Sequence, residues 1–284
     1  GRGGGGIGTG LFPPEVLLPR PAREPHGGGQ GGGLQGCPAG LPGKEGGGRT
    51  AGRGADKPLP FLTDATEANP ALGVRAYRTT RRDPEVLDHQ LEALAKAEAA
   101  TEAKVWVMAP MISTAEEAEA FTQKARSYGL KTAGMMIEVP SAALMADKLF
   151  EHADFASIGT NDLTQYVMAA DRLLSSLADL STGWQPAVLR LIKAACDGAS
   201  PHGRPVGVCG EAAADPALAV VLVGLGVASL SMTARALPDV DAVLKSLTLA
   251  ECQELAKVAL AAATAEDART AVSAQLPILE ELGL

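Results

Sequence analysis

Groups that could bind a metal ion and an anion follow two apolar stretches near the middle of the chain. Glu138 lies at the end of the first stretch, Asn161 and Asp162 follow the second, and Arg172 comes shortly after them. Mg²⁺ favours one or two protein carboxylates together with oxygens of its ligand. Two carboxylates beside an amide and a guanidinium therefore suit a divalent cation that holds an oxyanion or a phosphate. By position alone, the carboxylates could instead be exposed strand-end residues or a helix cap.

Two predicted strands position these groups. Residues 132–139 and 155–159 are apolar, end at Pro or Gly and lead into helical patterns, which is typical of buried parallel strands. Glu138 and Asp162 would then lie at the C-terminal ends of strands, where α/β barrels build their active sites.

Strands and helices alternate from residue 57 onward. Further strands are expected at 105–108, 205–209 and 228–232, and helices are expected to begin near residues 84, 115, 141, 161, 186, 215 and 238. This alternation predicts βαβ units and a parallel sheet. A short strand is also expected near Arg75. A chain of 284 residues is long enough for one α/β barrel of ~250 residues.

Composition excludes several classes of protein. The net charge is −8, and residues 1–57 carry seven Lys or Arg against four Asp or Glu, so the remainder is more acidic still and does not favour nucleic acid. No apolar window reaches the ~18 residues of a membrane span, and no signal-peptide pattern opens the chain, so we expect a cytoplasmic protein without a membrane contact. The four cysteines form no Cys-x-x-Cys or Cys/His cluster, which argues against a zinc site.

Five motifs resemble one known family. They are NPALGVR at 69–75, APMIS at 109–113, MIEVP at 136–140, SIGTNDLTQY at 157–166 followed by ADR at 170–172, and VGVCGEA at 206–212. In the family's order and at family-like separations, they resemble the phosphoenolpyruvate-binding barrel of enzyme I of the bacterial phosphotransferase system. Pyruvate phosphate dikinase and phosphoenolpyruvate synthase are relatives. The resemblance implies a (β/α)8 TIM-type barrel over residues 55–247, followed by C-terminal helices at 248–284.

Residues 1–54 form a Gly/Pro/Arg-rich segment. It holds 21 of the 33 glycines and shows neither strand nor helix periodicity. The family places its first two barrel strands here, and fragments at 6–12 and 49–57 still resemble them. A frame error in a GC-rich gene and a flexible linker both explain the composition; the fragments favour the frame error. We therefore expect the first two strands to be damaged or missing and residues 13–48 to lack regular structure.

The resemblance implies a role for each polar motif residue. Glu138 and Asp162 would ligate Mg²⁺, which bridges the phosphate and carboxylate of phosphoenolpyruvate. Asn161 would donate a hydrogen bond to the phosphate. Arg75 and Arg172 would bind the phosphate, for which a planar guanidinium fork is suited. Without the motif, each arginine would be expected to take part in a surface ion pair.

Four other positions bear on the site. Cys209 matches the residue that protonates the methylene carbon of enolpyruvate to give pyruvate, although by position alone it is a small buried residue. Arg49 is the candidate phosphate ligand from the second strand, and Lys57 is expected near the substrate carboxylate or in a solvated loop. Pro13 stands where the family has an arginine, which removes one cation from the phosphate site.

The implied partners lie outside this chain. None of the four histidines stands in the family's Thr-Ser-His context, so the phosphohistidine domain is expected to be absent, along with the domain that docks the small phosphocarrier protein. A homodimer is expected. Two alternatives stay open: a Mg²⁺-dependent lyase barrel of the citrate lyase or malate synthase kind that acts on an enolate, and a non-functional misframed fragment. The sequence does not identify the sugar transported.

Overall fold

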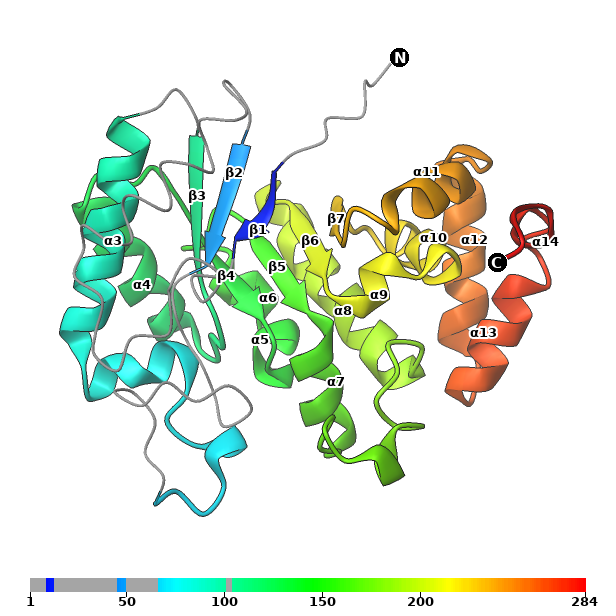
Figure 1. The fold of residues 1–284 in the computed structure, drawn as a ribbon, viewed down its shortest axis with the longest axis horizontal. Coiled ribbons are helices and arrows are strands. Elements are labelled where there is room, and N and C mark those ends of the chain that lie inside the picture. The colour runs from blue at the N-terminus through cyan, green and yellow to red at the C-terminus, as the bar shows by residue number, and fades with distance from the viewer. Residues whose placement is uncertain (1–8, 13–44, 50–65, 101–103) are drawn as a thin grey trace. The chain divides into compact units, whose positions relative to one another are not determined.

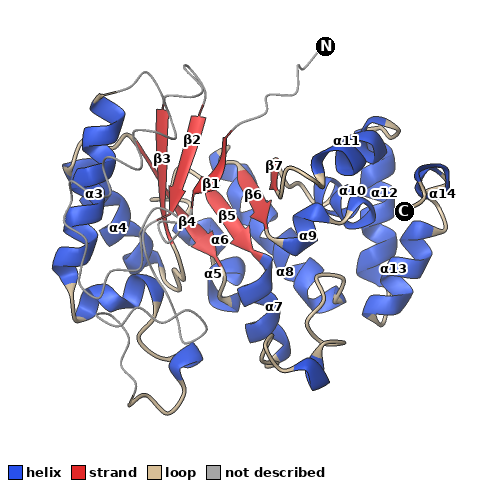
Figure 2. Ribbon diagram, viewed as in Figure 1, coloured by secondary structure: helices blue, strands red, loops and turns tan. Residues whose placement is uncertain are grey.

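The computed structural model describes residues 9–12, 45–49, 66–100 and 104–284, with the backbone alone described for the first two ranges (Figure 1). Two compact units can be distinguished. Unit 1 consists of Gly1–Met111 and Glu119–Met135, and unit 2 consists of Ile112–Ala118 and Met136–Leu284. Strands and helices alternate within each unit, as Figure 2 shows.

Unit 1 is built on parallel strands. They are β1 (Thr9–Phe12), β2 (Glu45–Arg49), β3 (Lys104–Ala109) and β4 (Thr132–Ile137), and the ladders β1–β2, β2–β3 and β3–β4 are all parallel. The last two residues of β4 belong to unit 2. The parallel pairing confirms the α/β class that the alternating pattern predicts.

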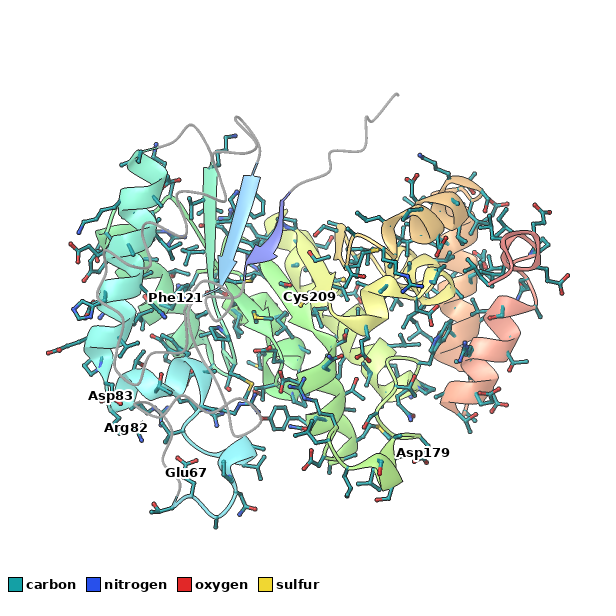
Figure 3. All side chains as sticks on the ribbon, in the orientation of Figure 1. Glu67, Arg82, Asp83, Phe121, Asp179 and Cys209 are labelled. Atoms are coloured by element: carbon teal, nitrogen blue, oxygen red, sulfur yellow. The ribbon has the colours of Figure 1, made fainter. Side chains whose placement is uncertain are left out.

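Two helices supply much of the apolar core of unit 1. Helix α3 (Pro84–Ala99) begins with Pro at its first turn and buries Leu87, Leu91 and Leu94 on one face, as its spacing predicts. Helix α4 (Ala115–Ser127) contributes Phe121, which Figure 3 labels. Its ring meets that of Tyr77 edge to face, with the centroids 5.9 Å apart. Aromatic pairs favour this geometry because the ring edge is positive and the face negative.

Two expectations for unit 1 need correction. Strand β2 shows that Glu45–Arg49 does have regular structure, although it contains three consecutive glycines. A ladder needs only backbone groups, and β2 pairs with both β1 and β3. The first two strands are therefore short but present in the backbone, whereas residues 13–44 lie outside the described part of the chain.

The second correction concerns the strand expected near Arg75. Arg75 itself is extended, but Ala76 has φ +55 and a 3₁₀ helix runs over Ala76–Arg81. The Thr79 and Thr80 hydroxyls donate to the carbonyls of Ala76 and Tyr77, three residues earlier. Such local bonds compete with strand pairing, and the described ranges hold seven strands rather than eight.

Unit 2 continues the alternation. Its strands β5 (Ala156–Gly159), β6 (Val206–Cys209) and β7 (Ser229–Ser231) form parallel ladders. The helices are α5 (Pro140–Leu144), α6 (Ala146–Leu149), α7 (Thr160–Met168), α8 (Pro186–Ala199), α9 (Glu211–Ala214), α10 (Pro216–Gly224) and α11 (Leu237–Lys245).

The helix expected from residue 141 is divided at Met145, whose ψ of 21° departs from helical geometry. Close packing of α8 on α6 uses Gly198, where a Cβ would come 2.6 Å from the Asp147 backbone nitrogen.

Three helices close the chain: α12 (Leu249–Ala261), α13 (Ala265–Ser273) and α14 (Ile278–Leu282). This agrees with the expected helical tail. Helix α12 begins with a capping box in which Thr248 and Glu251 satisfy each other's backbone N–H groups, and it packs against the apolar α10. Across the described ranges, no helix is both long and apolar enough to span a bilayer.

Candidate functional site

Glu138 lies directly after β4, in the part of the chain that belongs to unit 2, and its side chain is only 2% exposed. Gly159, the last residue of β5, lies against this side chain. A Cβ on Gly159 would approach Oε1 and Cγ of Glu138 to 2.7 Å, closer than real Cβ atoms come to other groups. The absence of a side chain at Gly159 therefore allows the Glu138 carboxylate to lie at this strand end.

The first turn of α7 begins immediately after Gly159. It contains Thr160, Asn161 and Asp162, and the last two side chains are half-buried. Glu138 and Asp162 thus both lie at the junction of β5 and α7. The N-terminal end of a helix also carries a partial positive charge that favours anions.

This donor set suits Mg²⁺. Within the described ranges, no group of three or more His, Cys, Asp or Glu residues could hold a metal ion. A metal at this junction would therefore take its protein ligands from Glu138 and Asp162 and complete its shell with water or ligand oxygens. Mg²⁺ accepts such a shell, whereas a structural zinc site requires four protein ligands.

Cys209 ends the neighbouring strand β6, in register with Gly159 (Figure 3). It is half-buried, and its thiol donates to the Ile158 carbonyl with Sγ and the oxygen 3.4 Å apart. The Thr160 hydroxyl donates to the Cys209 carbonyl at 3.1 Å, which joins the two strand ends. The next residue, Gly210, has φ +98, and its position brings the Asn161 amide oxygen to 3.5 Å from an ideal Cβ.

The other two described cysteines are less suited to proton transfer. Cys196 and Cys252 are buried and free. Burial, aided by the charge of Asp197, raises the pKa of the Cys196 thiol to about 12. Burial also raises the pKa of Cys252. Of the three described cysteines, only Cys209 is half-buried and beside the predicted site residues.

Arg172 lies in the loop after α7. Ala169 ends the helix in the left-handed conformation, and the Arg172 backbone N–H donates to Gln165 Oε1 at 3.2 Å. The loop is therefore tied back to the helix that carries Asn161 and Asp162. The side chain of Arg172 is half-buried.

The remaining predicted residues belong to unit 1 or lie outside the described part of the chain. Arg75 is 7% exposed and belongs to unit 1, where it precedes the 3₁₀ helix Ala76–Arg81. Arg49 ends β2, and only its backbone is described. Lys57 and Pro13 lie outside the described residues. Their roles in binding stay predictions.

Sequence reasoning missed two contributors to the junction. Gly159 provides space for Glu138, and Thr160 links the ends of β5 and β6. The Gly-Thr pair at the end of an apolar run was the available signal, because a glycine at such a position often marks a close approach of another group. Nothing local indicates that the group is a carboxylate 21 residues earlier in the sequence.

Comparisons with known proteins identify the family of this chain. A family model described as the PEP-binding domain of PEP-utilising enzymes matches residues 8–249. The phosphoenolpyruvate-protein phosphotransferase of Streptomyces coelicolor is 51% identical over 229 residues, which cover 80% of this chain and 41% of that protein. The multiphosphoryl transfer protein of Xanthomonas campestris pv. campestris is 46% identical over 222 residues, covering 76% of this chain and 26% of that protein.

Among solved structures, the citrate lyase beta subunit from M. tuberculosis, in complex with oxaloacetate and magnesium, is similar at 14% identity and a TM-score of 0.45. The alignment covers 81% of this chain and 83% of that one. Likeness at this level does not bear on the choice between a lyase and a phosphotransferase. The chain spans about two fifths of the S. coelicolor relative's length.

The family match supports the TIM-like barrel class that the motifs imply. It covers the two N-terminal strands as well as β3 to β7, and it includes every residue of the strand-end cluster. The chain therefore belongs to the PEP-utilising enzymes and corresponds to their PEP-binding domain.

Proposed function

We propose that this chain is the Mg²⁺-dependent, phosphoenolpyruvate-binding part of a phosphoenolpyruvate-protein phosphotransferase. One observation carries the proposal: Glu138, Asn161 and Asp162 lie at one strand–helix junction, and Cys209 ends the adjacent strand in register with it. These are the residue types that a phosphorylated, carboxylated substrate and its metal require. The names of the relatives from S. coelicolor and X. campestris support the same reaction class.

Each residue has a defined task in this proposal. Glu138 and Asp162 would hold Mg²⁺, which spreads the negative charge of the departing enolate. The side-chain N–H of Asn161 would donate a hydrogen bond to the phosphate, and Arg172 would neutralise part of the phosphate charge. After phosphate leaves, the Cys209 thiol gives its proton to the methylene carbon of enolpyruvate, and pyruvate forms.

The partners follow from the reaction. The phosphate would pass to a histidine of a separate domain and then to a small carrier protein, the first step of sugar uptake by a cytoplasmic phosphotransferase system. Arg75, Arg49 and Lys57 would complete the binding site for the phosphate and carboxylate, and the active form would be a homodimer. The printed names of the relatives support phosphoryl transfer, and the finer assignments are part of the proposal.

Calorimetry tests the site directly. We expect phosphoenolpyruvate to bind this chain only when Mg²⁺ is present, Asp162→Ala to abolish binding, and Glu138→Gln to weaken it at least about tenfold, since each removes a charged ligand. Asp179→Ala is the matched control, because this exposed aspartate lies in the loop after α7 and away from the strand ends (Figure 3).

Two results would contradict the proposal. The first is binding that does not depend on Mg²⁺, or equal affinity for the Asp162→Ala and Asp179→Ala chains. The second is aldol or lyase activity with an acyl-coenzyme A substrate, which would favour the enolate lyase alternative.

A further inference from the structure

One residue of α7, Gln165, accepts hydrogen bonds from three backbone N–H groups of the loop that follows the helix. Its carbonyl oxygen accepts from Ala169 and, at 3.1 Å, from Ala170. Its side-chain Oε1 accepts from Arg172 at 3.2 Å, and the side chain is half-buried. The loop is therefore closed onto the Gln165 side chain as well as onto the end of the helix.

The start of this loop has a backbone conformation that needs support. Ala169 adopts φ 49 and ψ 39, in the left-handed region that disfavours residues with a Cβ. Such a conformation persists where the surrounding structure fixes it. The next residue, Ala170, is 1% exposed and anchors the turn in the core. The three bonds to Gln165 help to offset the cost of the turn.

A second side chain fixes the backbone directly after Arg172. Asp171 Oδ1 accepts from the Leu173 N–H at 2.9 Å, and the Asp171 carbonyl accepts from the Leu174 N–H at 3.0 Å. Leu173 and Leu174 are 69% and 49% exposed, so their side chains add little apolar burial that could hold the loop. Polar bonds therefore hold much of the backbone here, and Gln165 accepts the one at Arg172 itself.

Gln165 also lies on the face of α7 that carries two candidate site residues. It follows Asn161 by four positions and Asp162 by three, and residues at these spacings are neighbours on a helix surface. A neutral amide suits this place. Its oxygen accepts the N–H of Arg172 without bringing a negative charge close to groups that would bind a phosphate, which a carboxylate would repel.

We propose that Gln165 is a positioning residue, which holds the Arg172 backbone so that the guanidinium can reach the phosphate bound beside Asn161 and Asp162. Gln165 acts through Arg172 rather than on the substrate. The role of Arg172 rests on the function proposed above, whereas the hold of Gln165 on the loop can be measured without Mg²⁺ or phosphoenolpyruvate.

Trypsin measures this hold, because it cleaves the Arg172–Leu173 bond when the chain there opens. Mass spectrometry of the fragment that begins at Leu173 follows this cut alone. We expect Gln165→Met to raise the rate of the cut about fivefold, the value of one hydrogen bond, since methionine keeps the length and helix propensity but has no amide oxygen. Gln165→Glu keeps an acceptor and should be cut at the wild-type rate.

Two further variants complete the trypsin series. Asp171→Ala removes the bond to Leu173 and should accelerate the same cut, so the test does not depend on one variant that folds. Gln275→Met is the matched control: the Gln275 side chain follows α13 and donates to the Ala271 carbonyl at 3.0 Å. Its loss removes a side chain–backbone bond of unit 2 and should leave the Arg172–Leu173 cut unchanged.

A double-mutant cycle separates positioning from general stabilisation of the helix. In calorimetry with Mg²⁺ and phosphoenolpyruvate, Gln165→Met should weaken binding about fivefold in a chain that has Arg172. In an Arg172→Met chain, the same change should weaken binding less than about twofold, because the group that Gln165 positions is already gone. A residue that only stabilised α7 would weaken both chains equally.

The proposal is overturned if trypsin cuts Gln165→Met after Arg172 no faster than it cuts the wild type. It is also overturned if Gln165→Met binds phosphoenolpyruvate as tightly as the wild type, or loses the same affinity with and without Arg172. Absence of Mg²⁺-dependent binding by the wild-type chain would instead overturn the function proposed above, and the trypsin series would still decide whether Gln165 holds Arg172.

Discussion

Two adjacent strands of unit 2 lead through a glycine into a helix, but the glycines are required for different reasons. Gly159 ends β5 with φ −87 and ψ 88, a negative φ that other residues also adopt, and a Cβ there would collide with Glu138 at 2.7 Å. Gly210 follows β6 with φ 98 and ψ −161, which is almost exclusive to glycine. The nearest atom to its ideal Cβ is Thr160 Oγ1 at 3.2 Å.

The two glycines therefore exclude a side chain for different reasons: lack of space at Gly159, and the backbone conformation at Gly210. At the end of β5, the missing side chain leaves room for a buried carboxylate of the candidate metal site. At the end of β6, the unusual backbone turns the chain so that Cys209 stays in the ladder while Glu211 starts the next helix. Gly159 is therefore required for the position of the neighbouring Glu138 side chain, whereas Gly210 is required for the turn of its own backbone from β6 into α9.

The largest effect is expected for Gly159→Ala. The new methyl group must displace the buried Glu138 side chain, so we expect a loss of about 3 kcal/mol in the free energy of unfolding, the upper range for overpacking, and a loss of Mg²⁺-dependent ligand binding. Denaturant unfolding and calorimetry measure the two effects. Because the clash is with a side chain, Glu138→Ala should restore most of the stability in the double mutant, with a coupling energy of about 2 kcal/mol.

A smaller effect is expected for Gly210→Ala. Its cost should be about 2 kcal/mol, mainly from backbone strain with a smaller part from the 3.2 Å contact to Thr160 Oγ1, and its coupling energy with Glu138→Ala should stay below about 0.5 kcal/mol. Gly129→Ala is the control for strain, since Gly129 has φ +93 and no atom within 4 Å of an ideal Cβ. If Glu138→Ala rescued Gly210→Ala as well as Gly159→Ala, the distinction between the two glycines would be wrong.

Much of this arrangement could be predicted from the sequence, because buried parallel strands leave a strong local signal. The apolar runs that became β4, β5 and β6 place Glu138, Asp162 and Cys209 at strand ends, and the helices follow from amphipathic spacing and from Pro at first turns. These signals are local, and what the structure adds between them is short: α9 and the 3₁₀ helices Ser175–Leu177 and Ser200–His202. The motifs then assign roles that periodicity alone cannot.

Other features depend on contacts that local patterns do not encode. Strand β2 contains three glycines and is held by ladders on both sides, so composition alone pointed away from it. The turn after Arg75 follows from hydroxyl bonds of Thr79 and Thr80. The unpaired hydroxyl of Thr164 has no sequence signal at all, because pairing depends on what the fold places around it.

The smallest effect is expected for Thr160→Val, which tests whether the two strand ends act together. The Thr160 hydroxyl donates to the Cys209 carbonyl at 3.1 Å and is also the nearest neighbour of Gly210. Valine keeps the shape and removes this bond, so we expect a loss of about 1 kcal/mol in the free energy of unfolding. Thr160 lies between Gly159 and Asn161, so removing its hydroxyl should also loosen the first turn of α7. We expect the loss in the free energy of ligand binding to be larger than the loss in the free energy of unfolding. Equal binding by the Thr160→Val and wild-type chains, measured by calorimetry with Mg²⁺ and phosphoenolpyruvate, would show that the β5 end holds its site residues without help from β6.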